Sequence, residues 1–128
     1  RFDRFPFGMV FKKKIPEKSI RKSRKTEVFE SFLKTVATHY KQQRSVTFYA
    51  DKLYLTPKYL SCVIKEISGK SAGEWIDEQV ILAAKALLKS SNMTIQEISV
   101  ELNFANQSFF GKYFKQHTGI SPKAYRKI

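Results

Sequence analysis

The sequence predicts an all-α fold of about seven helices, arranged as two helix-turn-helix subdomains joined by one long linker helix. Two observations predict this fold. Apolar residues recur three and four positions apart through most of the chain, as they do on the buried face of a helix, and almost no segment alternates as a strand does. In addition, the same order of helix-start, turn and glycine signals occurs twice, 50 residues apart.

The composition limits the class of protein. The chain has 128 residues, of which 42% are apolar, and a net charge of +13. This is enough apolar material for a hydrophobic core, and a strong excess of basic over acidic residues is typical of proteins that bind nucleic acids. One cysteine excludes a disulfide framework. No apolar run approaches the roughly 18 residues of a membrane span, so we expect a cytoplasmic protein with no membrane partner. The first residue is not Met, so we expect a piece of a longer protein.

The charge is concentrated at the start of the chain. Residues 1–27 contain ten basic and three acidic side chains, whereas residues 28–128 contain fourteen and eight. We expect residues 1–25 to be a basic linker or the remnant of a preceding domain. A solvated linker and an arm that lies on phosphates both fit this composition.

Three helices are expected in the first half. The first runs from Glu27 to Tyr40, where one apolar stripe contains Val28, Phe29, Phe32, Leu33, Val36, Ala37 and Tyr40. Ser45 can cap a short helix from Val46 to Leu53. A third helix begins at Thr56-Pro57, because Thr caps helices and Pro suits the first helical position, and it ends at Gly69.

A long helix follows. Ser71 and Glu74 form a capping box that opens it, and it continues to about residue 89. Its buried stripe is expected to contain Trp75, Ile76, Val80, Ala83, Ala84, Leu87 and Leu88.

The last part repeats the pattern of the first. Thr94 and Glu97 form a second capping box before a helix from Ile95 to Leu102. After a turn, Asn106 can cap a helix from Gln107 to His117, which Gly119 closes, and Ser121-Pro122 starts a short final helix.

The two halves match residue by residue. Gly69 and Gly119 are 50 positions apart, and the same shift pairs Thr56 with Asn106, Tyr59 with Phe109, Leu60 with Phe110, Ile64 with Phe114, Lys65 with Lys115, Ser71 with Ser121 and Trp75 with Tyr125. Ala105 is inserted in the second turn, so the shift is 49 upstream of it. We therefore expect one domain over residues 26–128, with subdomains at 26–70 and 91–128 and the linker helix at 71–90.

The second helix of each unit has a polar and basic side. Its apolar stripe is expected to face the core and consists of Tyr59, Leu60, Val63, Ile64 and Ile67 in the first unit, and of Phe110 and Phe114, with Phe109 and Tyr113 at the margin, in the second. The opposite side contains Pro57, Lys58, Ser61, Cys62 and Lys65, and in the second unit Gln107, Ser108, Gly111, Lys112, Lys115 and Gln116. Lys bonds to guanine acceptors, Gln pairs with adenine, and small residues allow close approach to base edges.

Other functions remain open at this point. The Phe and Tyr residues also suit a platform that stacks bases of single-stranded nucleic acid or RNA, and helix pairs with short turns also occur in interaction scaffolds. An enzyme is the least favoured class, since no acid, base or nucleophile constellation is visible. The two histidines and one cysteine have no metal-site spacing, so we expect neither metal nor cofactor.

Several stretches resemble a known family. They are Ala50-Asp51-Lys52-Leu53, Thr56-Pro57-Lys58-Tyr59-Leu60-Ser61, Ile95-Gln96-Glu97-Ile98-Ser99, Leu102-Asn103-Phe104, Ser108-Phe109-Phe110-Gly111-Lys112-Tyr113-Phe114-Lys115, Thr118-Gly119-Ile120-Ser121-Pro122 and Tyr125-Arg126. Together they resemble the C-terminal DNA-binding domain of AraC/XylS-family transcription regulators over residues 26–128. The resemblance implies sequence-specific binding of double-stranded DNA, with two reader helices in adjacent major-groove segments.

The resemblance also implies roles for individual residues. The base-reading candidates are Lys58, Ser61, Cys62, Gln107, Ser108, Gly111 and Lys112. The phosphate candidates are Thr56, Lys65, Asn106 and Lys115. Members often have Arg at the place of Cys62, so the first unit is expected to read fewer bases or to contact a thymine methyl. RNA polymerase is a further possible partner, and any effector would bind an N-terminal domain that precedes this one.

Overall fold

The structure is a computed structural model that describes residues 23–128, and within this range it contains seven α-helices and no strand. The helices are α2 (Arg24–His39), α3 (Val46–Lys52), α4 (Pro57–Ser68), α5 (Ala72–Ser90), α6 (Ile95–Glu101), α7 (Gln107–Thr118) and α8 (Pro122–Lys127). The predicted all-α fold is therefore confirmed over the described residues. The linker expected at residues 1–25 lies outside them, apart from its last three residues. Among the described helices, none has the length and apolar character needed to cross a bilayer.

The start of α2 differs from the prediction. The helix begins at Arg24, three residues before the expected Glu27. The physical reason is a cap that the apolar pattern does not include: the side chain of Ser23 accepts a hydrogen bond of 3.1 Å from the backbone N–H of Thr26.

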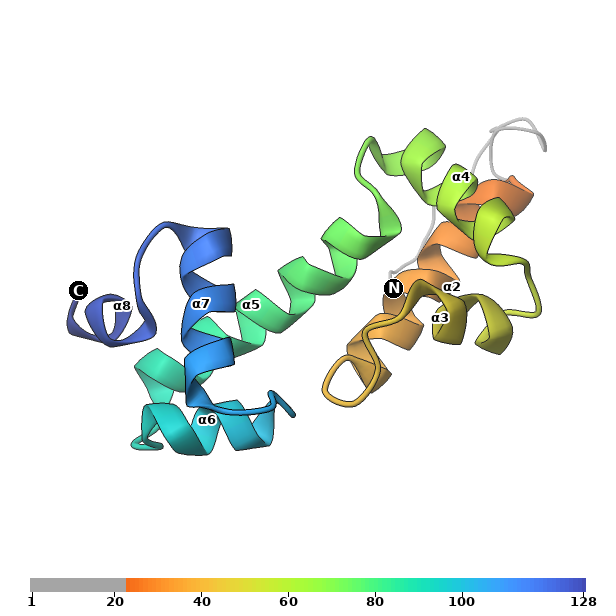
Figure 1. Ribbon diagram of the computed structural model, residues 1–128. Helices are drawn as coiled ribbons and strands as arrows, with labels where there is room; N and C mark the ends of the chain where they lie inside the picture. Colours follow the sequence, from red (N-terminus) through yellow and green to blue (C-terminus); the bar gives the residue numbers. More distant parts are fainter. Residues whose placement is uncertain (1–22) are drawn as a thin grey trace, which may run out of the picture.

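Two separate cores lie at the two ends of α5 (Figure 1). The first is formed by α2, α3, α4 and the beginning of α5, with Phe32, Tyr49 and Leu60 fully buried. The second is formed by the end of α5 with α6 and α7, and contains Phe110 and Phe114, also fully buried. α8 packs beside it. The long helix thus connects two helix-turn-helix units, as predicted.

Four residues assigned to buried stripes or their margins are exposed. Tyr59 and Ile67 retain 39% and 38% of their accessible surface, Phe109 retains 60%, and Ala37 is exposed as well. The prediction that they face the core is wrong, because each of these helices buries only a narrow stripe. The buried residues are Val28, Phe32 and Val36 on α2, Leu60, Val63 and Ile64 on α4, and Phe110 and Phe114 on α7. A helix on a small core buries a narrow stripe, so residues at its edge or in its last turn remain outside.

The two turns have the same backbone geometry, as the internal repeat predicts. Tyr54 and Asn103 each have φ of 60°, and each is followed by a residue whose N–H closes the turn. Leu55 donates to the carbonyl of Ala50 at 2.9 Å, and Phe104 donates to that of Ser99 at 2.8 Å. The left-handed conformation suits Asn better than Tyr.

Candidate nucleic-acid interface

The rotation of α4 is set by its cap and its core contacts. Thr56 accepts a hydrogen bond of 3.1 Å from the N–H of Tyr59, and Pro57 occupies the first helical position. Leu60, Val63 and Ile64 then point into the first core. As a consequence, the three base-reading candidates on α4 are all exposed, namely Lys58, Ser61 and Cys62.

The second reader helix, α7, is positioned in the same way. Asn106 Oδ1 accepts a hydrogen bond of 2.9 Å from the N–H of Phe109, and Phe110 and Phe114 anchor the helix in the second core. Its candidates Gln107, Ser108 and Lys112 are exposed. Phe109 is 60% exposed and belongs to this outer surface rather than to the core.

Gly111 differs from the other candidates. It is half-buried, and a Cβ built on it would meet no atom within 4 Å. Glycine inside a helix costs about 0.5–1 kcal/mol relative to alanine. The space around Gly111 is therefore not needed by the fold of the described residues, and it leaves room for a partner to approach the helix backbone.

The phosphate candidates occupy two different places. Thr56 and Asn106 are exposed caps at the starts of α4 and α7, where backbone N–H groups and the helix dipole favour anions. Lys65 and Lys115 lie in the last turns of the same helices. The ammonium of Lys65 donates to the carbonyl of Gly69 at 3.1 Å, so it also caps the end of its own helix.

The charge on this surface is almost entirely positive. Glu66 is the only acidic residue on α4 and α7, and it pairs with Lys25 of α2 at 3.1 Å. An exposed ion pair of this kind contributes little to stability. The ammonium of Lys25 nevertheless neutralises the one negative charge on the reader helices, that of Glu66.

Sequence reasoning did not find the contact that holds α7 against α5. The hydroxyl of Tyr113 donates a hydrogen bond of 2.7 Å to Asp77, and the ring of His117 lies 4.5 Å from that of Tyr113. Burial raises the pKa of Tyr113, and the hydrogen bond and negative charge of Asp77 raise it further. Asp77 has no partner close in sequence, so no local pattern could identify it.

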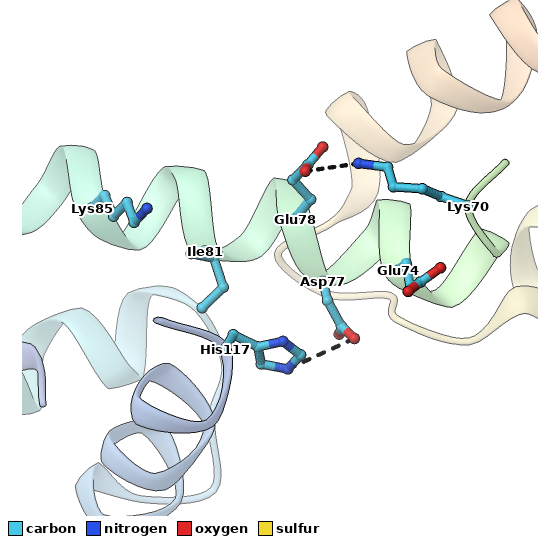
Figure 2. Close-up of a pocket in the computed structure, with 7 residues that line it drawn as sticks. All are labelled: Lys70, Glu74, Asp77, Glu78, Ile81, Lys85 and His117. Carbon is cyan, nitrogen blue, oxygen red and sulfur yellow. Dashed lines mark hydrogen bonds and ion pairs between the residues drawn. The ribbon is translucent and has the colours of Figure 1, made fainter. Parts of the chain in front are cut away.

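A pocket beside this contact is lined by none of the residues predicted to contact DNA. Figure 2 shows it between the ends of α4 and α7, along α5, with Lys70 paired to Glu78 and His117 beside Asp77. The ion pair of Lys70 with Glu78 has a distance of 2.8 Å, and Nε2 of His117 lies 3.8 Å from a carboxylate oxygen of Asp77. Its lining mixes carboxylates with cations, so it offers no concentrated positive charge to phosphates. In the described part of the chain, no group of His, Cys, Asp and Glu side chains could hold a metal ion.

Comparison with known proteins agrees with this geometry. A family described as "Helix-turn-helix domain" matches residues 49–128. The regulatory protein PocR of Salmonella typhimurium is 30% identical over 95 residues, which cover 74% of this chain and 31% of PocR. The arabinose operon regulatory protein of Escherichia coli is 34% identical over 77 residues, which cover 60% of this chain and 26% of that protein. The chain thus spans about a third or less of the length of these relatives.

Solved structures have the same fold. The C-terminal domain of AraT, a response regulator from Geobacillus stearothermophilus, superposes with a TM-score of 0.75 at 28% identity, covering 82% of this chain and 88% of that one. The DNA-binding domain of the global transcriptional factor AdpA, solved in complex with a target DNA, superposes with a TM-score of 0.69 at 22% identity, covering 77% and 89%.

Proposed function

Because the chain belongs to the AraC/XylS family of helix-turn-helix transcription regulators and is a DNA-binding domain of that family, we propose that α4 and α7 read adjacent major-groove segments of one face of double-stranded DNA. The observation that carries the proposal is the repeated geometry of the two units. Each presents a capped helix of 12 residues whose outer side is polar or basic and whose inner side is anchored in its own core.

Base reading is assigned to the outer side chains near the helix starts. Lys58 and Lys112 suit the acceptors of guanine, and Gln107 suits adenine. Ser61 and Ser108 accept either kind of base edge. The exposed thiol of Cys62 is a weak donor, so we assign it to contact with a thymine methyl.

Phosphate contacts hold the domain on the duplex. The hydroxyl of Thr56 and the amide N–H₂ of Asn106 can each donate to a phosphate oxygen while their oxygens cap the helix. Lys65 and Lys115 add positive charge farther along α4 and α7. Such contacts fix the position of a domain on DNA and supply much of its affinity.

We extend the proposal from the DNA-binding domain to the other parts and partners of the whole protein. We assign residues 26–128 to DNA binding and residues 1–25 to a linker from a preceding domain that would bind any effector. RNA polymerase is the second macromolecular partner. The site acts by binding alone, without catalysis or cofactor, and DNA as the proposed partner supports our assignment of the protein to the cytoplasm.

Exposed aromatic side chains favour a second candidate, the binding of single-stranded nucleic acid by base stacking. Phe109 is 60% exposed and Tyr59 39%, and both are on the outer sides of the reader helices. Phe110 and Phe114 are fully buried and unavailable to bases. Only isolated aromatic rings are therefore left to stack bases, whereas proteins that bind single strands stack successive bases on several aromatic side chains.

Selection on a random duplex pool tests the proposal. The salt concentration is kept near physiological, since phosphate binding depends on it. We expect enrichment of a bipartite motif whose halves are about one helical turn, roughly 34 Å, apart. Binding without enrichment would contradict sequence-specific reading. Stronger binding to single strands than to duplexes, with quenching of tyrosine fluorescence, would favour the second candidate.

A further inference from the structure

The two helix-turn-helix units also touch directly, through residues outside α5. The loop between α2 and α3, residues 40–45, lies against the turn between α6 and α7 (Figure 1). The amide of Asn103 donates to the carbonyl of Lys41 at 2.9 Å, and the ammonium of Lys41 lies 2.5 Å from Glu101. The guanidinium of Arg44 donates to the carbonyl of Leu102. The second unit is therefore held at a second place besides the linker helix.

Arg44 is the centre of this contact. It is half-buried, its guanidinium lies 4.5 Å from the centre of the Phe104 ring, and its Nε donates to the carbonyl of Tyr40 at 3.3 Å. Burial lowers the pKa of Arg44, an effect that nearby Tyr113 and Asp77 oppose, and a guanidinium remains charged at neutral pH. One side chain thus joins the end of α2 to the turn that precedes the second reader helix.

The position of this turn determines where α7 begins. Only Ala105 and Asn106 separate Phe104 from Gln107, the first residue of α7. The Phe104 ring also packs 5.1 Å from the rings of both Phe110 and Tyr113 on α7. A shift of Phe104 relative to the first unit would therefore move α7.

A single helix between two units allows bending and twisting about its axis. A second contact, between the α2–α3 loop and the α6–α7 turn, removes much of that freedom. Tyr40, which packs against both cores, supports the same connection. The separation and rotational phase of α4 and α7 then depend on the loop contact as well as on α5.

We propose that Arg44 is a positioning residue for DNA recognition, which fixes the placement of α7 relative to α4 and thereby the spacing between half-sites that the domain accepts. The inference rests on the proposed function, since spacing has meaning only if both helices read DNA. Moving a half-site by one base pair displaces it about 3.4 Å along the duplex and rotates it about 35° around the axis. A rigid pair of reader helices rejects such a shift, whereas a loosened pair tolerates it.

The first test needs no DNA. Cys62 is the only cysteine of the chain and is exposed on α4, so spin labels on Cys62 and on a Gln116→Cys substitution in α7 report the distance between the reader helices. We expect a narrow distance distribution in the parent and a broader one in Arg44→Ala. Arg44→Lys should be intermediate, because Lys can donate to Leu102 but lacks the planar group that stacks on Phe104. Lys34→Ala is the control, since it removes an exposed charge from α2 away from the contact.

The second test uses the motif enriched from the random pool, in duplexes whose two half-sites are at the preferred spacing or one or two base pairs closer or farther apart. The parent should bind the preferred spacing about tenfold or more tightly than the others, comparable to the cost of a mismatched base pair. Arg44→Ala should bind all spacings within about threefold of one another, a smaller difference than one mismatch gives. Its affinity for a single half-site should match that of the parent.

The outcomes separate the two proposals. If Arg44→Ala keeps both the narrow distribution and the spacing preference, the positioning role is overturned. If the parent binds no duplex specifically, the proposed function fails, while the label distances still decide whether Arg44 holds the units together. Asn103→Ala removes another hydrogen bond of the same contact and serves as the second variant if Arg44→Ala does not unfold cooperatively. If both Asn103→Ala and Arg44→Lys keep the distance distribution of the parent, the proposal is also overturned.

Discussion

The hydroxyl of Tyr113 and the carboxylate of Asp77 form a hydrogen bond of 2.7 Å between α7 and α5. Tyr113 is on the helix that we assign to DNA reading, and Asp77 is in the first half of the linker helix. The bond therefore ties the second unit to a part of α5 nearer the first unit. Its strength depends on a neutral phenol that donates and a charged carboxylate that accepts.

This bond predicts a loss of stability at alkaline pH. The pKa of Tyr113 is raised above the ordinary value of 10.0 by burial, by the hydrogen bond with Asp77 and by its charge. Above about pH 10 the unfolded chain releases this proton and the folded chain keeps it, so the free energy of unfolding falls as pH rises, by at most about 1.4 kcal/mol per pH unit. Chemical denaturation from pH 8 to 11.5 measures the slope.

Tyr113→Phe should make that slope shallower. Tyr49, whose pKa is raised to about 12 by burial, and Lys41, whose pKa is raised by its hydrogen bond with Glu101, contribute slopes of the same sign, so some alkaline loss will remain in the variant. The comparison is therefore between variant and parent at each pH. Equal slopes in the two proteins would show that Tyr113 does not titrate differently on folding.

Lys112→Ala should weaken binding to the selected site by about 1–3 kcal/mol, because a base contact is lost, and should leave binding to random duplexes nearly unchanged. Lys115→Ala, one turn farther along the same exposed side, is the matched comparison. It should weaken both classes of DNA alike, since we assign it to phosphate. Titrations at constant salt distinguish the two, and an equal loss on both DNAs for Lys112→Ala would reassign it to the backbone.

Gly111→Ala should raise the free energy of unfolding by about 0.5–1 kcal/mol and weaken or alter DNA binding. The added Cβ meets no atom within 4 Å in the fold, so only a partner can clash with it. Gly73→Ala is a suitable control, because its Cβ would lie at an ordinary 3.9 Å from Ser71 Oγ and α5 is not a reader helix. A gain in stability with full DNA affinity for Gly111→Ala would place Gly111 away from the interface.

The salt dependence of affinity measures the phosphate contacts. If roughly six phosphates are neutralised, log affinity should fall with log salt at a slope of about −5. Removing residues 1–22 should flatten this slope without changing the preferred sequence, because that segment contains eight basic and two acidic side chains. The truncation keeps Ser23, whose side chain caps α2. An unchanged slope would mean that the segment does not touch phosphates.

Much of the architecture could be predicted because its signals are local. The capping boxes at Ser71 and Thr94 are present as expected, with both of their hydrogen bonds. The glycines that close α4 and α7 have φ of 80° and 88°, the left-handed conformation that glycine tolerates. A cap or a turn involves residues a few positions apart, so a single sequence contains all of its parts.

The exposed sides of the reader helices could also be predicted, but their edges could not. Lys58 and Lys112 are exposed as the helical period requires. Tyr59 and Phe109 are exposed too, although they are apolar, because the neighbouring helices cover only the centre of each stripe. The width of a buried stripe depends on which helices pack against it, and periodicity alone does not contain that information.

The sequence by itself therefore determines the local structure of this protein. The seven helices, the two matching units and the polar side of each second helix are predicted from signals that each involve residues within one or two turns of each other. The placement of one unit relative to the other is decided only by the tertiary structure. Arg44 meets Leu102 across 58 positions, and Tyr113 meets Asp77 across 36. Contacts between residues so distant in sequence produce no periodic pattern in it. They form only once both cores have folded and α5 has brought the two units into contact.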